Sequence, residues 1–372
     1  MPVSIAYLVH DLGDAAVVRR VTSLEAGGGD VRLAGFFRRQ PPTEVAGLRP
    51  LALGRTEDAR LAQRALLVLL MLLVPGRLVR LVHGAQVIVA RNLEMLIIAA
   101  RLRQPGQRLV YECLDIHRLM LRRDLLGSAM RALERRLLKR VDRVLVSSPA
   151  FEREYFRARQ HHAGPIDLVE NKVAAMPAAM TDREADGPWT IGWFGMLRCR
   201  RSLALLGQIA AGSGGRIKVL IAGIPSSNEF PDFEGSVRML DGVEFAGRYG
   251  PQDLARLYAR VHFAWCIDYF EEGLNSRWLL PNRLYESIAH GAVPVALRGV
   301  ETGRWLAEAG VGLVLDEGAA IGQLLAAMKT QQYDVLRAQV AAVPRPRIAF
   351  THDDHQHLVA RLAGAQPHDR QS

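Results

Sequence analysis

Short apolar runs alternate with longer helical segments along this chain, and no other feature limits its fold as strongly. Runs such as Val87-Ile88-Val89-Ala90 and Arg143-Val144-Leu145-Val146 are typical of strands buried on both faces of a parallel sheet. The predicted strands of a first series are 3–9, 31–37, 86–90, 108–113, 142–147 and 166–170, with helices at 15–26, 57–74, 93–103, 118–140 and 149–159. The pattern therefore predicts a doubly wound α/β domain.

A second α/β series follows an interruption at residues 171–189, whose composition is typical of a linker. Its predicted strands lie near 190–194, 217–222, 242–246, 261–267, 292–297 and 311–315, and its last helices at 319–329 and 332–341. We therefore expect a first domain at 1–170, a linker at 171–189, a second domain at 190–345, a C-terminal helical segment at 346–364 that crosses back to the first domain, and a disordered tail at 365–372. Two such domains imply a cleft, with ligands at the carboxyl ends of strands.

The positive charge of the chain is concentrated in its first half. Residues 1–188 hold 29 Lys and Arg against 20 Asp and Glu, whereas residues 189–372 hold 19 against 18. This asymmetry predicts an anionic partner for the first domain. Nucleic acid is disfavoured because few aromatic residues accompany the basic ones and no nucleic-acid-binding motif is present. The three cysteines form no C-x-x-C pair, and the N-terminus lacks the features of a signal peptide, so we expect a cytoplasmic protein.

Two segments of the first half predict a membrane-facing surface. Residues 65–74 are ten consecutive apolar residues, too few to span a bilayer as a helix, which needs about 20. Residues 117–141 read as one amphipathic helix with many arginines. Apolar stripes flanked by Arg suit a protein that lies on an anionic membrane, although a core helix next to a solvated basic helix is the alternative. The expected membrane-facing residues are Leu66, Leu69, Leu70, Leu73, Arg64, Arg77, Arg122 and Arg123.

A Gly turn followed by three arginines opens the second domain. Gly195 ends a predicted buried strand, and Arg198 and Arg201 stand at the start of the next helix. A diphosphate at that helix N-terminus would meet unpaired N–H groups and guanidinium forks. A basic surface loop is the alternative. The N-terminal cluster Gly27-Gly28-Gly29 follows a helix rather than a strand, so it predicts a helix stop and not a dinucleotide fingerprint.

A carboxylate and a cation stand close together in the segment 280–295. This segment reads as a loop, a helix beginning near Asn282, a Gly turn and a buried strand, with Arg283, Leu284 and Glu286 inside the helix. Such a helix start suits a ligand that carries vicinal hydroxyls and phosphates, as a nucleotide-sugar does. The alternative is an ordinary α/β unit in which Glu286 points to solvent. The chain has no Asp-x-Asp motif, so we expect no metal and no cofactor, with side chains and helix dipoles on the leaving phosphate.

Together these two motifs resemble the GT-B glycosyltransferases, in particular family 4-like enzymes and the succinoglycan-type exopolysaccharide glucosyltransferases. The family's Gly-Arg-Leu-x-x-x-Lys-Gly loop matches 195–202, with Met196 in place of its Arg and Arg201 in place of its Lys. The second Glu of its Glu-x7-Glu motif matches Glu286, whereas the first is replaced by Trp278. The resemblance implies two Rossmann-like domains that face each other across a cleft.

The resemblance also implies roles for the donor-binding residues. Glu286 would bind the donor ribose, and the loop with Arg248 and Tyr249 would bind the base. Asn275, Asn282 or Glu272 would supply the sugar contact that is missing at Trp278. We therefore expect donor binding by Gly195, Arg198, Arg201, Arg248, Tyr249, Asn275, Asn282, Arg283, Leu284 and Glu286.

The catalytic group is expected after a strand of the first domain. Asp115 is similar to the Asp of a turn in related enzymes and would take the proton of the acceptor hydroxyl or stabilise an oxocarbenium-like sugar. Glu112, His117 and Asp11 are rival candidates, and an N-cap of the following helix is the structural alternative for Asp115. The bunched histidines and aspartates at 352–357 are better explained by a helix start capped by Thr351 than by a metal site.

The sequence thus predicts a glycosyltransferase of bacterial exopolysaccharide synthesis. By resemblance the donor is UDP-glucose and the acceptor is a saccharide on a polyprenyl diphosphate, at the inner face of the cytoplasmic membrane. A sugar-nucleotide epimerase of the same fold and a non-catalytic, membrane-bound assembly partner with a degenerate donor site are the alternatives.

Overall fold

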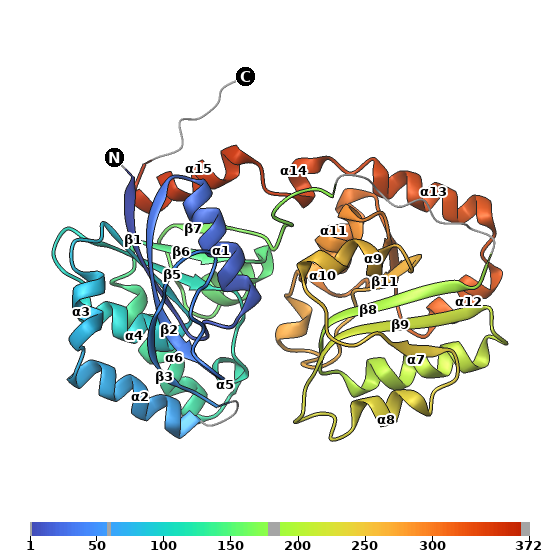
Figure 1. The fold of residues 1–372 in the computed structure, drawn as a ribbon, viewed down its shortest axis with the longest axis horizontal. Coiled ribbons are helices and arrows are strands. Elements are labelled where there is room, and N and C mark those ends of the chain that lie inside the picture. The colour runs from blue at the N-terminus through green and yellow to red at the C-terminus, as the bar shows by residue number, and fades with distance from the viewer. Residues whose placement is uncertain (1, 58–60, 178–186, 366–372) are drawn as a thin grey trace. The chain divides into compact units, whose positions relative to one another are not determined.

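The computed structural model of this protein describes residues 2–57, 61–177 and 187–365 (Figure 1). The chain divides into two compact units. The first consists of Met1–Glu170 with Phe350–Ser372, and the second of Asn171–Ala349. Residues 178–186 of the expected linker and residues 366–372 of the expected disordered tail lie outside the described residues.

The described part of the first unit contains a seven-stranded parallel sheet in the order β3-β2-β1-β4-β5-β6-β7. Its strands are β1 (Val3–Val9), β2 (Gly29–Phe37), β3 (Leu51–Arg55), β4 (Val87–Arg91), β5 (Arg108–Cys113), β6 (Arg143–Val146) and β7 (Ile166–Leu168). All five residues of β4 are buried, as expected for a strand covered on both faces. The chain order of the strands reverses between β1 and β4, which makes this position the switch point of the sheet.

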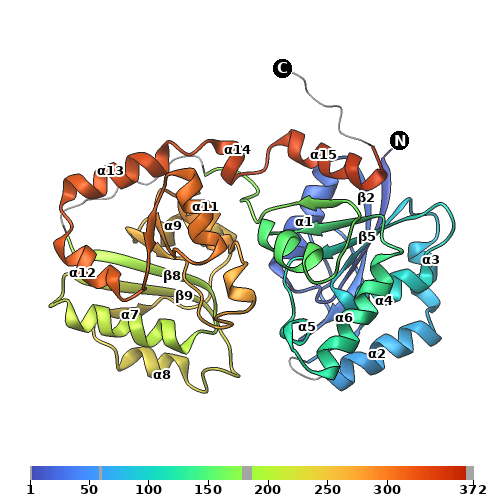
Figure 2. The same ribbon diagram turned by 180° about the vertical axis from the view of Figure 1, so that it is seen from behind.

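Helices cover both faces of this sheet. They are α1 (Ala15–Ala26), α2 (Leu61–Leu73), α3 (Gly76–Val82), α4 (Leu93–Leu102), α5 (Arg118–Leu121), α6 (Leu125–Leu138), a π-helical segment (Phe151–Arg157) and α15 (His352–Ala363). Figure 2 shows α4 and α6 in front of the sheet, and α4 contacts both α2 and α6. On the opposite face α15 packs against α1, and its Leu358, Val359 and Leu362 join the core formed by Ile5, Tyr7 and Val9.

Close packing of α15 on α1 depends on the end of α1. A β-carbon on Gly27 would lie 2.2 Å from the His355 carbonyl oxygen, so only glycine lets the helices approach this closely. Gly27 caps α1 and Gly28 has a φ of +86°, which confirms the predicted helix stop. Thr351 caps α15 by accepting from the Asp354 amide, as predicted for this segment.

The helix predicted at 118–140 is wrong as a single element. It is broken into α5 and α6, because Asp124 caps a new helix by accepting a hydrogen bond from the Gly127 amide at 2.9 Å. Arg122 and Asp124 form an ion pair at the break. Strand β3 and helix α3 were not predicted.

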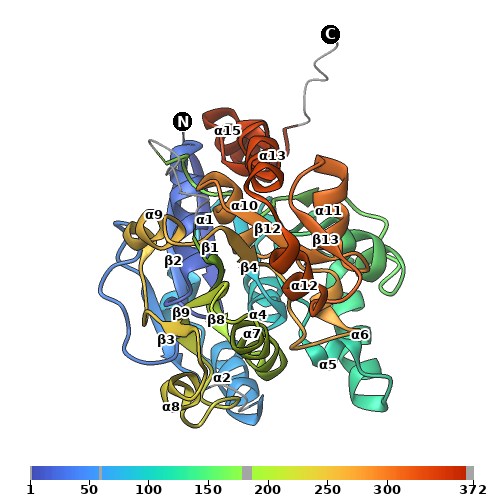
Figure 3. The ribbon, with the colours of Figure 1, turned by 90° about the vertical axis from the view of Figure 1, so that its right-hand side faces the viewer.

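The second unit, in its described part, contains a six-stranded parallel sheet in the order β10-β9-β8-β11-β12-β13. Its strands are β8 (Trp189–Leu197), β9 (Ile217–Pro225), β10 (Val243–Phe245), β11 (Phe263–Trp265), β12 (Val293–Leu297) and β13 (Leu313–Leu315). Its helices are α7 (Arg200–Gly212), α8 (Phe233–Arg238), α9 (Leu254–Tyr258), α10 (Asn282–Ala289), α11 (Glu301–Ala309), α12 (Ala320–Ala327), α13 (Thr330–Ala341) and α14 (Arg345–Ile348), with short 3₁₀ turns at Pro251–Asp253 and Asn275–Arg277. Here the strand order reverses between β8 and β11. Figure 3 shows α7 and α8 on one side of β8 and β9, with α9 and α10 on the other.

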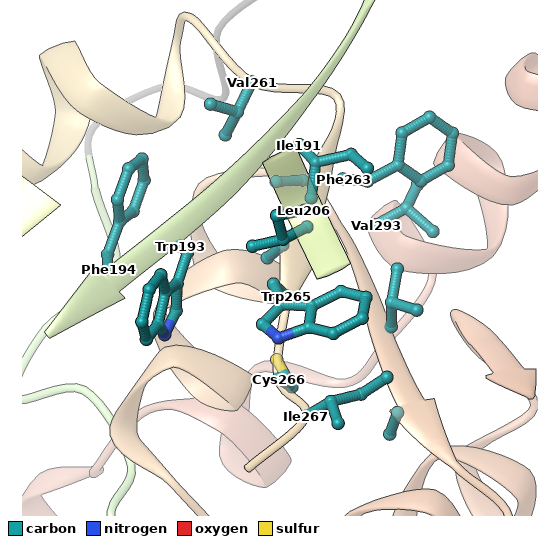
Figure 4. Close-up of a cluster of buried hydrophobic side chains, with 14 of the residues drawn as sticks. Ile191, Trp193, Phe194, Leu206, Val261, Phe263, Trp265, Cys266, Ile267 and Val293 are labelled. Carbon is teal, nitrogen blue, oxygen red and sulfur yellow. The ribbon is translucent and has the colours of Figure 1, made fainter. Parts of the chain in front are cut away.

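Large aromatic side chains fill the core at this switch point (Figure 4). Trp193 of β8 and Trp265 of β11 are almost completely buried. The indole Nε1 of Trp265 donates to Ser202 Oγ at 3.2 Å, which ties the first turn of α7 to β11. The core thus fixes the start of α7 over the carboxyl ends of β8 and β11.

Candidate functional site

The carboxyl end of β8 is an open stretch of backbone. Gly195 has a φ of +115°, and a β-carbon built on it meets no described atom within 4 Å. Its carbonyl oxygen lies so close to Gly223 of β9 that a β-carbon on Gly223 would come within 1.8 Å. Glycine at both positions therefore lets the strands stay paired while the chain turns towards α7, leaving room for a ligand next to the backbone.

Arg198 and Arg201 flank the N-terminus of α7 and are held by the loop that follows β11. The Arg198 guanidinium lies 3.4 Å from Asp268 and 4.7 Å from the ring centroid of Phe270. Arg201 pairs with Glu272 and lies 4.1 Å above Tyr269. The side chain of Arg201 is 59% exposed, so an anion in solvent can reach it. Both arginines stand at the N-terminus of α7, where an anion can replace or join their carboxylate partners.

Glu286 lies half-buried on α10, which begins at Asn282 as predicted. Burial raises the pKa of the Cys266 thiol to about 11, with Glu286 adding to the shift and Arg283 opposing it. The pKa of Tyr258 is raised well above its usual value by burial and then by Glu286. Arg283 also donates to the Ile267 carbonyl oxygen at 3.4 Å. The Glu286 carboxylate and the Arg283 guanidinium therefore lie together beside the end of β11.

The predicted base-binding loop reaches the same place. The ring of Tyr249 lies 6.3 Å from Phe194, whose ring lies 5.0 Å from that of Tyr258. Tyr249, Arg283 and Glu286 thus lie around Tyr258, whose ring also contacts Phe194, the residue before Gly195. Arg248 is exposed on the loop, and Asn275 is buried at the start of a 3₁₀ turn.

Leu284 has to be removed from the expected donor contacts. Its side chain is completely buried in the core, and its amide donates to the Pro281 carbonyl oxygen at 3.0 Å. Asn282, in contrast, is the first residue of α10 and is half-buried, so its side chain stays a candidate contact.

A cavity of about 590 Å³ opens next to Arg201, between α7 and the segment 316–319 after β13. Tyr269 and Glu272 line it together with Gln208 of α7. A β-carbon on Gly318 would lie 2.4 Å from the Tyr269 hydroxyl oxygen, so this glycine permits the close approach of the two segments. The sequence did not predict that segment 316–319 lines this cavity, because nothing in its residues indicates that it lies near Arg201.

In the first unit, Asp115 lies exposed in the turn between β5 and α5. The N-cap of α5 is His117, whose Nδ1 accepts from the Leu119 amide at 3.3 Å. The alternative of an Asp115 N-cap is therefore wrong. Burial is the main cause that lowers the pKa of His117. Asp115 is thus an accessible carboxylate at the carboxyl edge of the sheet.

Glu112 is a poor candidate for a base, because it is completely buried among cations. Arg20 and Arg91 bind its two oxygens, and Tyr7 donates to it as well. Burial alone would raise the pKa of Glu112, but the two guanidiniums hold it at about 2. Glu112 therefore stabilises the fold.

Asp11 lies just after β1 and is only 8% exposed. It pairs with Arg38 at 2.9 Å and accepts from the Gly13 amide at 3.0 Å. Both of its oxygens are thus engaged by the fold, which leaves Asp115 as the most accessible carboxylate of the rival candidates.

The four leucines expected to face a membrane lie on the outer side of α2. Leu66, Leu69, Leu70 and Leu73 are 66%, 50%, 46% and 71% exposed, whereas Val68 is buried. Arg77 and Arg123 are exposed, Arg122 pairs with Asp124, and Arg64 lies 3.9 Å from Glu94 of α4. Among the described helices none is long and apolar enough to cross a bilayer alone. Helices α2 and α3, with a bend of 71° between them, have sufficient length and apolar composition only when they are taken together.

The described residues contain no group of three or more His, Cys, Asp or Glu side chains placed to hold a metal ion. The three cysteines, all within the described ranges, are buried and unpaired.

Comparison with known proteins gives one close relative and many similar structures. No family model matches the chain. It is 47% identical over 333 residues to the succinoglycan biosynthesis protein ExoL of Rhizobium meliloti (strain 1021), covering 86% of this chain and 82% of that protein.

Two solved structures illustrate the structural similarity. Sucrose-phosphate synthase from Thermosynechococcus elongatus superposes with a TM-score of 0.71 at 16% identity, over 97% of this chain and 98% of that one. Anabaena HepE in complex with UDP-glucose gives 0.69 at 14%, over 96% and 98%. These similarities show the fold, which is GT-B as predicted.

Proposed function

Because this chain belongs to the family of the succinoglycan biosynthesis protein ExoL, we propose that it is a glycosyltransferase of exopolysaccharide synthesis that transfers glucose from UDP-glucose to a lipid-linked saccharide. The observation that carries the proposal is the convergence at the β8/β11 switch point. There the N-terminus of α7, with Arg198 and Arg201, and the Glu286 side of α10 meet at the carboxyl edge of the sheet. HepE, of the same fold, was crystallised with UDP and with UDP-glucose, which supports this choice of donor class.

In the proposed donor complex, Glu286 accepts hydrogen bonds from the ribose hydroxyls, and Tyr249 lies next to the base. The diphosphate lies at the α7 N-terminus, where Arg198 and Arg201 exchange their carboxylate partners for phosphate oxygens. Guanidinium forks match phosphate geometry and remain charged at any physiological pH. Asn275 and Asn282 contact the sugar in place of the carboxylate that Trp278 replaces.

The proposed reaction forms a bond between an acceptor oxygen and the anomeric carbon while the bond from that carbon to the UDP oxygen breaks. Asp115 takes the proton of the acceptor hydroxyl or stabilises the positive charge of the sugar. The arginines and the helix dipole stabilise the negative charge that develops on the departing diphosphate. In this proposal these groups neutralise the diphosphate without a metal ion, in line with the lack of an Asp-x-Asp motif.

We place the protein at the inner face of the cytoplasmic membrane, bound peripherally through its first unit. The exposed leucines of α2 and the excess of Arg in the first half of the chain support this placement. Such a surface would bring the enzyme to an acceptor whose polyprenyl carrier lies in the bilayer.

A direct test uses the lipid-linked saccharides that accumulate in cells lacking the protein. The purified protein is incubated with this extract and a panel of labelled nucleotide-sugars, and the product is identified by mass and NMR. UDP release from UDP-glucose that depends on the extract supports the proposal. Conversion of the nucleotide-sugar without the extract would indicate an epimerase, and a failure to bind UDP would indicate a non-catalytic partner.

Two variants assign the roles of the residues. Asp115→Asn should abolish transfer and leave UDP affinity unchanged. Glu286→Gln should weaken UDP binding, measured by calorimetry, by about tenfold, because a hydrogen bond to a charged group contributes about 1.5–3 kcal/mol. Glu308→Gln, at an exposed position of α11, is the matched control. Normal turnover of Asp115→Asn would refute its catalytic assignment.

A further inference from the structure

The loop that joins β11 to α10, residues 266–281, contacts both arginines of the proposed diphosphate site. The Arg198 guanidinium lies 3.4 Å from the Asp268 carboxylate and 4.7 Å from the ring centroid of Phe270. The loop itself orients Asp268, because the other carboxylate oxygen accepts a hydrogen bond from the Phe270 amide at 2.9 Å. A carboxylate of the chain itself thus occupies a guanidinium that the proposed donor needs.

The same combination of a carboxylate and an aromatic ring is repeated at Arg201. Its guanidinium pairs with Glu272 and lies 4.1 Å from the ring centroid of Tyr269. Both charged side chains of this pair are more than half exposed, at 59% and 57%. Ion pairs with this exposure contribute little to stability, so support of the fold explains the pair poorly. Such a pair is readily exchanged for a phosphate, whose oxygens match the guanidinium fork.

The two ion pairs together carry no net charge, because each guanidinium is matched by one carboxylate of the loop. A donor diphosphate brings negative charge on both of its phosphates. It therefore meets strong repulsion if it binds while both carboxylates stay in place. Binding requires that the carboxylates leave the arginines, and their return favours the departure of the nucleotide.

We propose that Asp268 and Glu272 are internal competitors of the diphosphate, which weaken the binding of UDP and so ease its release after transfer. This role of Glu272 is opposite in sign to a contact with the donor sugar, since a competitor lowers the affinity for the donor and a contact raises it. The inference rests on the proposed function, because it assigns a form of regulation to the same donor site.

The test uses Glu272→Gln and Asp268→Asn, which remove one charge each and keep the size of the side chain. Glu229→Gln is the matched control, because Glu229 lies outside the loop and 3.5 Å from Arg200, in the first turn of α7. It reports the effect of removing any negative charge near this helix start. The affinities for UDP and UDP-glucose are measured by calorimetry, and melting temperature verifies that each variant folds.

UDP should bind about fivefold more tightly to Glu272→Gln than to the unmodified protein, which is the size expected for an exposed ion pair. The gain should be at least as large for Asp268→Asn, whose pair is less exposed, at 30% and 15%. UDP-glucose should gain affinity by the same factor as UDP. Glu229→Gln should change neither affinity by more than about twofold.

Two results would overturn the inference. The first is that UDP binds the two loop variants no more tightly than it binds Glu229→Gln. The second is that Glu272→Gln loses affinity for UDP-glucose and keeps that for UDP, because Glu272 would then be a contact of the donor sugar.

Failure of the proposed function would give a different result. If the unmodified protein binds neither UDP nor UDP-glucose, inorganic pyrophosphate tests the loop carboxylates without a nucleotide. Tighter binding of pyrophosphate by Glu272→Gln than by Glu229→Gln would support the competition at Arg201, and equal binding by the two variants would refute it.

Discussion

Among single residues, Glu112 joins several elements of the first unit through one carboxylate. Tyr7 of β1, Arg20 of α1 and Arg91 of β4 all donate to it from around β5. Removing one partner of a buried ion pair leaves an uncompensated charge, which commonly costs about 3–5 kcal/mol. Glu112→Gln should therefore lower the free energy of unfolding by an amount in this range at pH 7.

The pKa of Glu112 also predicts how this loss depends on pH. Its folded value, about 2, lies below the ordinary 4.5, so the ionised carboxylate contributes about 3 kcal/mol above pH 4.5. That contribution disappears as the pH falls from about 4.5 to about 2. Urea unfolding at pH 7 and pH 3 should therefore show a smaller difference between the unmodified protein and Glu112→Gln at the lower pH. A difference that stays constant would contradict the low pKa, and Glu308→Gln should behave as the unmodified protein at both values.

At the scale of elements, α2 carries a row of exposed leucines along its outer side while Val68 faces the unit. Burying one leucine contributes about 1.5–3 kcal/mol. The double variant Leu69→Gln/Leu73→Gln should therefore weaken binding to vesicles that contain anionic phospholipid by at least tenfold. Its melting temperature should not fall, since both side chains are exposed in the fold. Co-sedimentation with vesicles measures the effect, and Val335→Gln, 55% exposed on α13, is the control.

The same vesicles separate apolar insertion from charge. Because the first half of the chain has the excess of Arg, raising the salt concentration should weaken binding to anionic vesicles, and neutral vesicles should bind poorly. Equal binding by the double variant and the unmodified protein would show that α2 is not the contact surface.

Elements with a local signal were predicted well. Strand β1 and helix α1 have the boundaries expected from their apolar pattern, and α15 begins directly after its expected cap, Thr351. The break between α5 and α6 was missed because leucines and arginines continue through it with a helical period. Only the Asp124 cap, one hydrogen bond among many candidates, ends the pattern. Similarly, the role of Glu112 could not be read from its neighbours in sequence, because its cations come from 92 and 21 residues away.

At the scale of the whole molecule, the first unit is discontinuous. It is built from Met1–Glu170 and completed by Phe350–Ser372, with the second unit between them in sequence. Leu362 of α15 is completely buried against this core, so Leu362→Ala should lower the stability of the first unit by about 2–5 kcal/mol. His357→Ala on the exposed side of the same helix should change it by less than about 0.5 kcal/mol. Urea unfolding, followed separately for each unit, would measure the stability change in both variants. If the unfolding transition of the first unit were unchanged in Leu362→Ala, this result would contradict the packing of α15.

The packing of α15 on α1 also sets the order of events during synthesis. Domains generally fold as units, the N-terminal one first, while the ribosome is still adding residues. Here the earliest-made unit lacks part of its core until residue 362 has emerged, although the second unit is by then fully translated. A chain released early would keep an uncovered apolar surface on α1 and β5, where chaperones and proteases act. The first unit can therefore complete its core only after the ribosome has synthesised α15 to its end.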